Sequence, residues 1–147
     1  MPFQTLFAPG SIFLDGTITA SVHEHGNPAP TFIVKTTDSW AVNINWTNTG
    51  DLTPMVGGTY DLHLLLERMG PGPDFDLTDP FLPDHRVPLT PGPAPVNYFR
   101  HVDVAANVVP AGVYKLVVLI RYFDLTGQPG PVAAYEEISP LIQFYEP

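Results

Sequence analysis

Proline and glycine interrupt this chain so often that long helices have little room to form. The 147 residues include 18 prolines and 12 glycines, spread along the whole sequence. Proline removes a backbone donor and clashes with the preceding helical turn, and glycine weakens a helix through its backbone entropy. The stretches between these breakers alternate apolar and polar residues, which is the period of a β-strand with one buried face. The sequence therefore predicts an all-β protein.

Two of the alternating segments look like copies of one strand. Gly, Tyr and two Leu recur at matching positions in residues 58–68 and 112–122. Further strands are expected at residues 12–22, 31–35, 40–48, 96–104, 132–138 and 141–145. Residues 113–123 are apolar on both faces, so this strand should be central in its sheet. We predict a single antiparallel β-sandwich domain, residues 1–147, with seven or eight strands.

A short motif in the second copy adds to this prediction. The segment Val109-Pro-Ala-Gly-Val-Tyr-Lys-Leu116 resembles the turn and Gly-x-Tyr-x-Cys signature before strand F of immunoglobulin-like and fibronectin-III-like domains, with Leu116 in place of the cysteine. The resemblance implies that Tyr114 is a corner tyrosine whose hydroxyl bonds back to the turn backbone. It also implies that Trp40 or Trp46 is the core tryptophan. It implies no activity, because such sandwiches serve many functions.

The charge of the chain restricts its partners. Fifteen acidic residues oppose six basic ones, giving a formal net charge of -9 without any basic cluster. We therefore expect neither nucleic acid nor an anionic membrane as a partner. Only 14% of the residues are charged, whereas soluble domains average about 25%. A surface so poor in charge favours self-association, in which another subunit covers part of it.

Residues 70–95 form a long segment rich in proline and aspartate, which we expect to be an irregular loop. Closely spaced carboxylates can supply the oxygen ligands that Ca²⁺ prefers. The candidate ligands are Asp74, Asp76, Asp79 and Asp84. The alternative is that these aspartates only make turns by accepting backbone N–H bonds. We expect no resident cofactor, with Ca²⁺ at this loop as the exception.

Apolar residues in the same loop and at the chain end are candidates for a protein interface. The loop alternates apolar residues with its acids, so it should pack on this molecule or on a neighbour. The terminal strand can pair with its own sheet or with a neighbour's edge. The interface candidates are Phe75, Phe81, Leu82, Phe144 and Tyr145.

Histidines provide the remaining polar candidates. His23 and His25 are two apart and share one face of a strand, so they could bind Zn²⁺ with a third ligand from His63, His85 or His101. The alternative is an exposed polar turn on the outer side of the sheet.

The sequence lacks the paired constellations of an enzyme. It has no Gly-x-Ser-x-Gly, P-loop or dinucleotide motif, and none of its serines has an obvious neighbouring base. We therefore expect a non-enzymatic binding or structural module, a subunit or accessory component of a homo-oligomeric assembly. The alternative function is a Ca²⁺-dependent or carbohydrate-binding module. An enzyme with an unrecognised site would use Asp61, His63, Glu67 or His101.

The compartment is left open by the sequence. No stretch approaches the roughly 20 apolar residues of a membrane helix, and the first residues lack the basic and apolar regions of a signal peptide. The absence of cysteine is compatible with the cytoplasm, which we favour.

Overall fold

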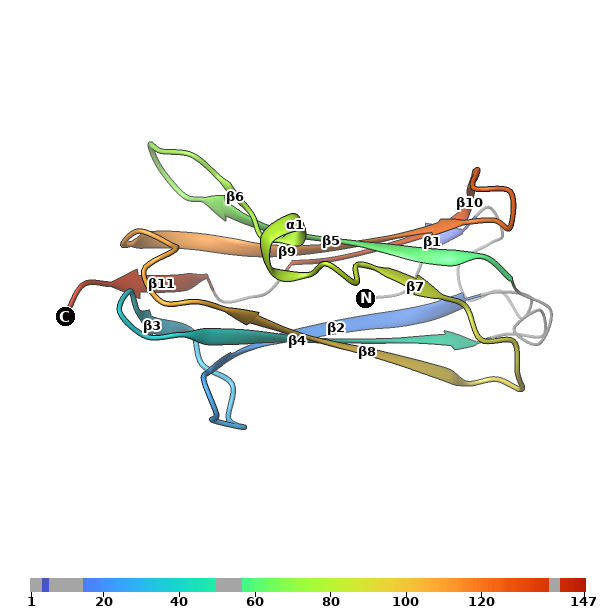
Figure 1. Ribbon diagram of the computed structural model, residues 1–147, viewed down its shortest axis with the longest axis horizontal. Coiled ribbons are helices and arrows are strands. Elements are labelled where there is room, and N and C mark those ends of the chain that lie inside the picture. Colours follow the sequence, from blue (N-terminus) through green and yellow to red (C-terminus); the bar gives the residue numbers. More distant parts are fainter. Residues whose placement is uncertain (1–3, 6–14, 50–56, 138–140) are drawn as a thin grey trace.

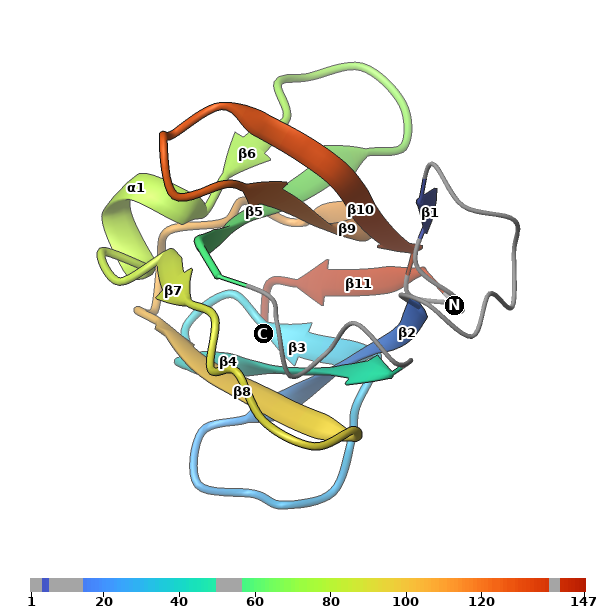
Figure 2. The same ribbon diagram turned by 90° about the vertical axis from the view of Figure 1, so that its right-hand side faces the viewer.

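The structure is a computed structural model that describes residues 4–5, 15–49, 57–137 and 141–147. It is an all-β fold of two stacked sheets (Figures 1 and 2), as the alternating pattern predicts. The strands are β1 (Gln4–Thr5), β2 (Asp15–Glu24), β3 (Ile33–Lys35), β4 (Trp40–Thr49), β5 (Thr59–Arg68), β6 (Phe75–Asp76), β7 (Arg86–Pro88), β8 (Val96–Val104), β9 (Gly112–Phe123), β10 (Pro129–Glu137) and β11 (Ile142–Tyr145). One short helix, α1, spans Thr78–Phe81.

The small sheet has the antiparallel order β2–β4–β8. The large sheet is built around β9, which pairs with β5 on one side and with β10 and β11 on the other. The prediction that residues 113–123 are central in their sheet is therefore confirmed. The two similar segments lie side by side as β5 and β9, running antiparallel.

The terminal strand β11 is part of the large sheet of the same molecule. It pairs antiparallel with β9 and parallel with β3. Figures 1 and 2 show β11 and β3 between the two layers, where they close one side of the sandwich. We expected this strand to pair either with its own sheet or with the edge of a neighbouring molecule, and the structure shows the first arrangement.

The core fills the space between the sheets with alternate residues of each strand. Trp40 and Trp46 of β4 are both buried, as expected for a strand with one inward face. Trp46 stacks on Tyr98 at 5.4 Å between ring centroids, and Trp40 meets Phe144 edge-on at 5.2 Å. Tyr60 of the large sheet meets both Trp46 and Tyr98 edge-on, so these rings and the Trp40–Phe144 pair connect the two layers. Aromatic pairs of this kind add to the stabilisation from buried area.

The tyrosine that opens each similar segment is buried. The hydroxyl of Tyr114 donates to the carbonyl of Pro110 at 3.0 Å, which is the bond back to the turn that the motif implies. The hydroxyl of Tyr60 donates to Asn48. Each hydroxyl thus has a partner, which offsets the cost of burying it.

The segment 70–95 differs from the predicted irregular loop. It contains β6, α1 and β7, of which β6 and β7 pair with the free side of β5. The hydroxyl of Thr78 anchors α1 by accepting the N–H of Leu64 at 2.8 Å. The part of the chain that the structure describes contains no helix with the length and hydrophobicity needed to span a bilayer.

Candidate functional sites

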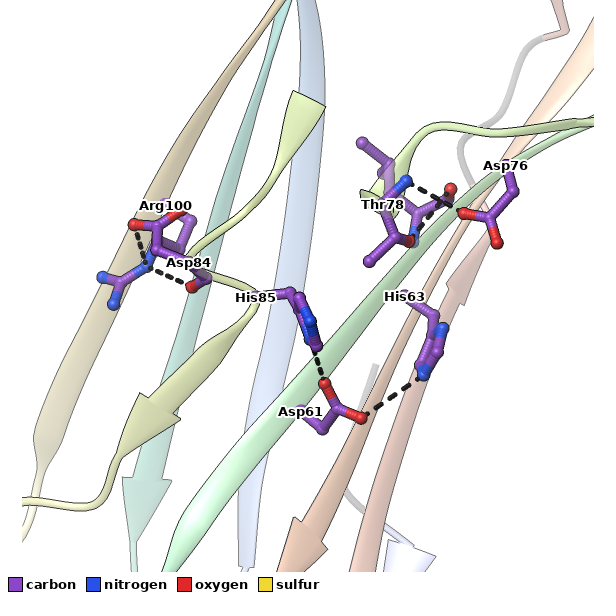
Figure 3. A network of polar contacts seen from close by, with 8 residues as sticks. Asp61, His63, Asp76, Thr78, Asp84, His85 and Arg100 are labelled. Carbon is purple, nitrogen blue, oxygen red and sulfur yellow. Dashed lines mark hydrogen bonds and ion pairs between the residues drawn. The ribbon is translucent and has the colours of Figure 1, made fainter. Parts of the chain in front are cut away.

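The described carboxylates of the segment 70–95 do not converge. Asp74 accepts the N–H of Arg68 at 2.9 Å, Asp76 accepts the N–H of Thr78 at 2.9 Å, and Asp84 pairs with Arg100 at 3.2 Å. Figure 3 shows Asp76 and Asp84 in separate contacts. The side chain of Asp79 lies outside the described part of the chain. Among described residues no group of three or more metal-binding side chains comes together. The described carboxylates thus act as turn and ion-pair partners.

The residues predicted as an interface face inward in most cases. Leu82 and Phe144 lie in the core of this molecule, so neither is available to a partner. Phe75 and Phe81 are partly buried and pack against the same core. Only Tyr145 retains an outward position, at the end of β11. The alternation of apolar residues in the segment 70–95 is therefore explained by packing of this segment onto the large sheet of the same molecule.

A different polar cluster forms on the outer face of the large sheet. Asp61 accepts from Nδ1 of His85 at 2.5 Å and lies 3.4 Å from Nε2 of His63 (Figure 3). In the strand register Asp61 stands opposite Arg86 on one side and Arg121 on the other. The carboxylate of Asp61 is thus surrounded by groups that carry or can accept a positive charge.

A small pocket of about 140 Å³ adjoins this cluster, lined by Thr59, Asp61, Arg86, Phe123 and Gly127. An Asp–His pair can orient a general base, but the base needs a nucleophile to act on. In the described residues no serine or threonine hydroxyl bonds to the second ring nitrogen of His85. The contacts of Asp61 thus tie His85, the residue just before β7, to strand β5.

The outer face of the small sheet carries a larger hollow, of about 420 Å³. The strands supply its floor and the turn after β2 supplies a wall. Its lining residues are His23, Glu24, His25, Gly26, Asn27, Pro28, Ala41, Asn43, His101 and Asp103. We call this hollow the polar pocket. It brings together three of the five histidines, including the predicted pair.

Hydrogen bonds fix several side chains of the polar pocket. His101 contacts Asn43 Oδ1 through Nδ1 at 2.5 Å and Asp103 Oδ1 through Nε2 at 2.9 Å. The strand register explains the first contact, because Asn43 stands directly opposite His101. A zinc ion at His23, His25 and His101 finds no support, since the described residues contain no metal-binding group of three.

Beside the pocket, Ser21 lies 2.6 Å from Nε2 of His23, a contact that the sequence did not reveal. His23 was expected on the outer side as an exposed residue, yet it is only 7% exposed. A serine nucleophile needs a base that a third group orients. Nδ1 of His23 is buried and has no hydrogen-bond partner among the residues that the structure describes, so none of these residues orients the ring. This Ser–His contact therefore lacks the arrangement of a catalytic triad.

A row of apolar side chains crosses the outward side of β3, β11 and β9 and reaches the end of β5. Ile33 stands opposite Gln143, which stands opposite Val113, and the N–H of Met69 bonds to the carbonyl of Val113 at 2.9 Å. Ile33 is 55% exposed, and Met69, Val113 and Leu141 are each at least 36% exposed. We call Ile33, Met69, Val113 and Leu141 the apolar row.

Sequence reasoning missed Asn43 and Asp103 as site residues. The alternation of residues 40–48 placed Asn43 on the outer face, and the strand 96–104 places His101 and Asp103 on one face. The missing information was which two strands are neighbours, since β4 ends at Thr49 and its partner β8 begins only at Val96. The comparisons with known proteins give no further guidance, because no model of a protein family and no curated protein matches the chain.

Proposed function

We propose that this protein functions by binding, and that one partner is a second copy of the same chain. The observation that carries the proposal is the apolar row, which leaves large aliphatic side chains in water on the outward side of a sheet. Large aliphatic side chains that gather on one exposed face are a feature of interaction sites in soluble proteins. A second copy that covered the row would remove this surface from water. The free energy gained would be roughly 25 cal/mol for each Å² of apolar surface buried.

The surroundings of the row fit a second copy. Lys35 follows Ile33 along β3, and Glu67 and Lys115 stand opposite each other on β5 and β9 next to the row. Charges of both signs thus flank the apolar residues. A two-fold arrangement brings the same surface of each copy together, so that a positive flank of one can meet a negative flank of the other.

Light scattering coupled to size-exclusion chromatography tests this proposal. We expect the mass to rise toward that of a dimer or larger assembly as the concentration increases to about 1 mM, the upper end of weak affinities. Ile33→Glu places a charge in the row and should return the protein to a monomer. The matched control is Leu125→Glu in the turn between β9 and β10, which adds the same charge at a residue 85% exposed.

A monomeric mass at the highest concentration would refute self-association. Equal loss of association in both variants would instead trace the effect to net charge and would remove the apolar row from the interface. Leu125 is suited to this comparison because it follows the last residue of β9, whereas Val113 lies at the start of that strand.

We further propose that the sandwich belongs to the immunoglobulin-like class. In support, β2, β4 and β8 have the order of strands A, B and E, and β5, β9 and β10 that of C, F and G. Tyr114 near the start of β9 makes the corner hydrogen bond of strand F. The departure is that both tryptophans lie on β4, the position of strand B. Amide-to-amide NOEs test the proposal, and a different strand order would contradict it.

A further inference from the structure

The polar pocket has a lining that selects by charge. Glu24 and Asp103 contribute carboxylates, and the lining contains neither lysine nor arginine. The whole molecule adds a formal net charge of -9. Phosphates, sulfates and acidic sugars are therefore repelled from this site.

The hydrogen-bonding groups of the pocket are held in place before any ligand arrives. His101 is fixed between Asn43 and Asp103. It is still 46% exposed at its side chain, and Asp103 is 64% exposed. An amide, an imidazole and a carboxylate side by side offer both donors and acceptors. Such a set matches hydroxyl groups, each of which donates one hydrogen bond and accepts others.

An exposed aromatic ring lies next to the pocket on the same face. Phe99 is two residues before His101 on β8, about 7 Å away along the strand, and is 50% exposed. In the register it stands opposite Asn45, which stands opposite Thr19. The C–H edges of a ring-shaped ligand can pack on the negative face of this aromatic ring, while polar neighbours on both strands remain within reach of its substituents.

We propose that the outer face of the small sheet binds a neutral oligosaccharide. Hydroxyl groups of one sugar residue bond to Asn43, His101 and Asp103 in the polar pocket, and the next residue of the saccharide packs on Phe99. The turn after β2, with His25 and Asn27, limits the pocket on one side. The saccharide thus runs along β8 across the face.

Isothermal titration calorimetry with cellohexaose, xylohexaose, mannohexaose, maltohexaose and chitohexaose tests the proposal. We expect at least one of these neutral hexasaccharides to bind with a dissociation constant below about 1 mM. Phe99→Ala and Asn43→Ala should each weaken that affinity about tenfold or more, because each removes a group at the centre of the contact. Phe32→Ala makes the same change outside the small sheet, next to β3, and should leave the affinity unchanged.

Three results would overturn the proposal. One is the failure of all five hexasaccharides to bind at millimolar concentration. Another is binding that Phe99→Ala and Asn43→Ala leave intact while the variants keep the wild-type melting curve. The third is binding that EDTA abolishes, which would make a metal ion the recognised group. Binding by Ile33→Glu as tight as by the wild type would show that this site is independent of the proposed self-association.

Discussion

At the scale of single residues, the buried tyrosine hydroxyls are the most informative groups. Tyr60 is 2% exposed, and its hydroxyl bonds to Asn48 inside the core. Burial raises the pKa of Tyr60 well above its ordinary value. The pKa of Tyr122 is raised in the same direction, again mainly by burial. These hydroxyls stay protonated in the folded protein at a pH where they would ionise in the unfolded chain.

The first prediction concerns alkaline pH. Because the folded pKa of Tyr60 is raised, its stabilising contribution is complete below about pH 10 and declines as the pH rises further. The unfolded state loses a proton that the folded state keeps, so the free energy of unfolding should fall by about 1.4 kcal/mol per pH unit from this group. Urea denaturation at several values above pH 10 measures the slope.

Tyr60→Phe provides the comparison. This substitution should lower the free energy of unfolding by about 1–3 kcal/mol at neutral pH, because Asn48 loses its hydrogen-bond partner in the core. Above pH 10 its stability should decline less steeply than that of the wild type. Parallel slopes would mean that Tyr60 ionises in the folded protein, contrary to its burial.

The sequence predicted single residues well where one local motif determines the contact. The bond from Tyr114 to Pro110 follows from the Gly-x-Tyr pattern and a turn only four residues upstream. The burial of His23 did not follow, because its cover comes from the turn after β2, which folds back so that Pro30 forms a bridge with His23. A strand pattern gives the side of the sheet but not what covers it.

At the scale of elements, β5 and β9 show how similar segments become neighbours. Gly58 directly precedes β5 and Gly112 begins β9, and the two strands pair antiparallel over ten positions from Thr59 to Arg68. At Gly58 the backbone has a φ of 109°, and a Cβ would overlap the carbonyl oxygen of Phe123. The glycine is therefore required both by its dihedral angle and by the close approach of the neighbouring strand.

The second prediction follows from this approach. Gly58→Ala should destabilise the protein clearly more than Gly26→Ala, when both are measured by urea denaturation. Gly26 also has a positive φ of 73°, but nothing lies within 4 Å of its added Cβ. Gly26→Ala should therefore lower the free energy of unfolding only by the backbone strain, which is about 1–2 kcal/mol. Equal losses would show that β5 and β9 can separate locally to admit a methyl group.

Strand positions were predictable and the small elements between them were not. Alternation alone placed β4, β5, β8 and β9 to within a residue or two. In contrast, β6 and β7 exist because β5 has a free side, and α1 is anchored by the contact of Thr78 with Leu64. Contacts of this kind join distant segments, so a pattern within a local window does not contain them.

At the scale of the whole molecule, net charge and apolar surface oppose each other. Two copies with a formal charge of -9 each repel, whereas the apolar row favours contact between them. Salt screens the repulsion, with a Debye length of about 10 Å at 0.1 M and about 3 Å at 1 M. The balance between these terms therefore depends on ionic strength.

The third prediction is that added salt tightens self-association. Sedimentation equilibrium in about 0.05 M and about 0.5 M NaCl should give a lower dissociation constant at the higher salt, because screening weakens the repulsion and leaves apolar burial intact. Ile33→Glu should remain monomeric in both solutions. Weaker association at high salt would show that ion pairs, rather than the apolar row, hold the copies together.

The apolar row and the polar pocket lie on different sheets, with the core between them. Copies joined through the row would therefore display their pockets outward, away from the contact. A polymeric glycan could then engage two pockets at once, and the second engagement would take place at a high effective concentration. Modest affinity at each site would in this way become strong avidity without any additional contact.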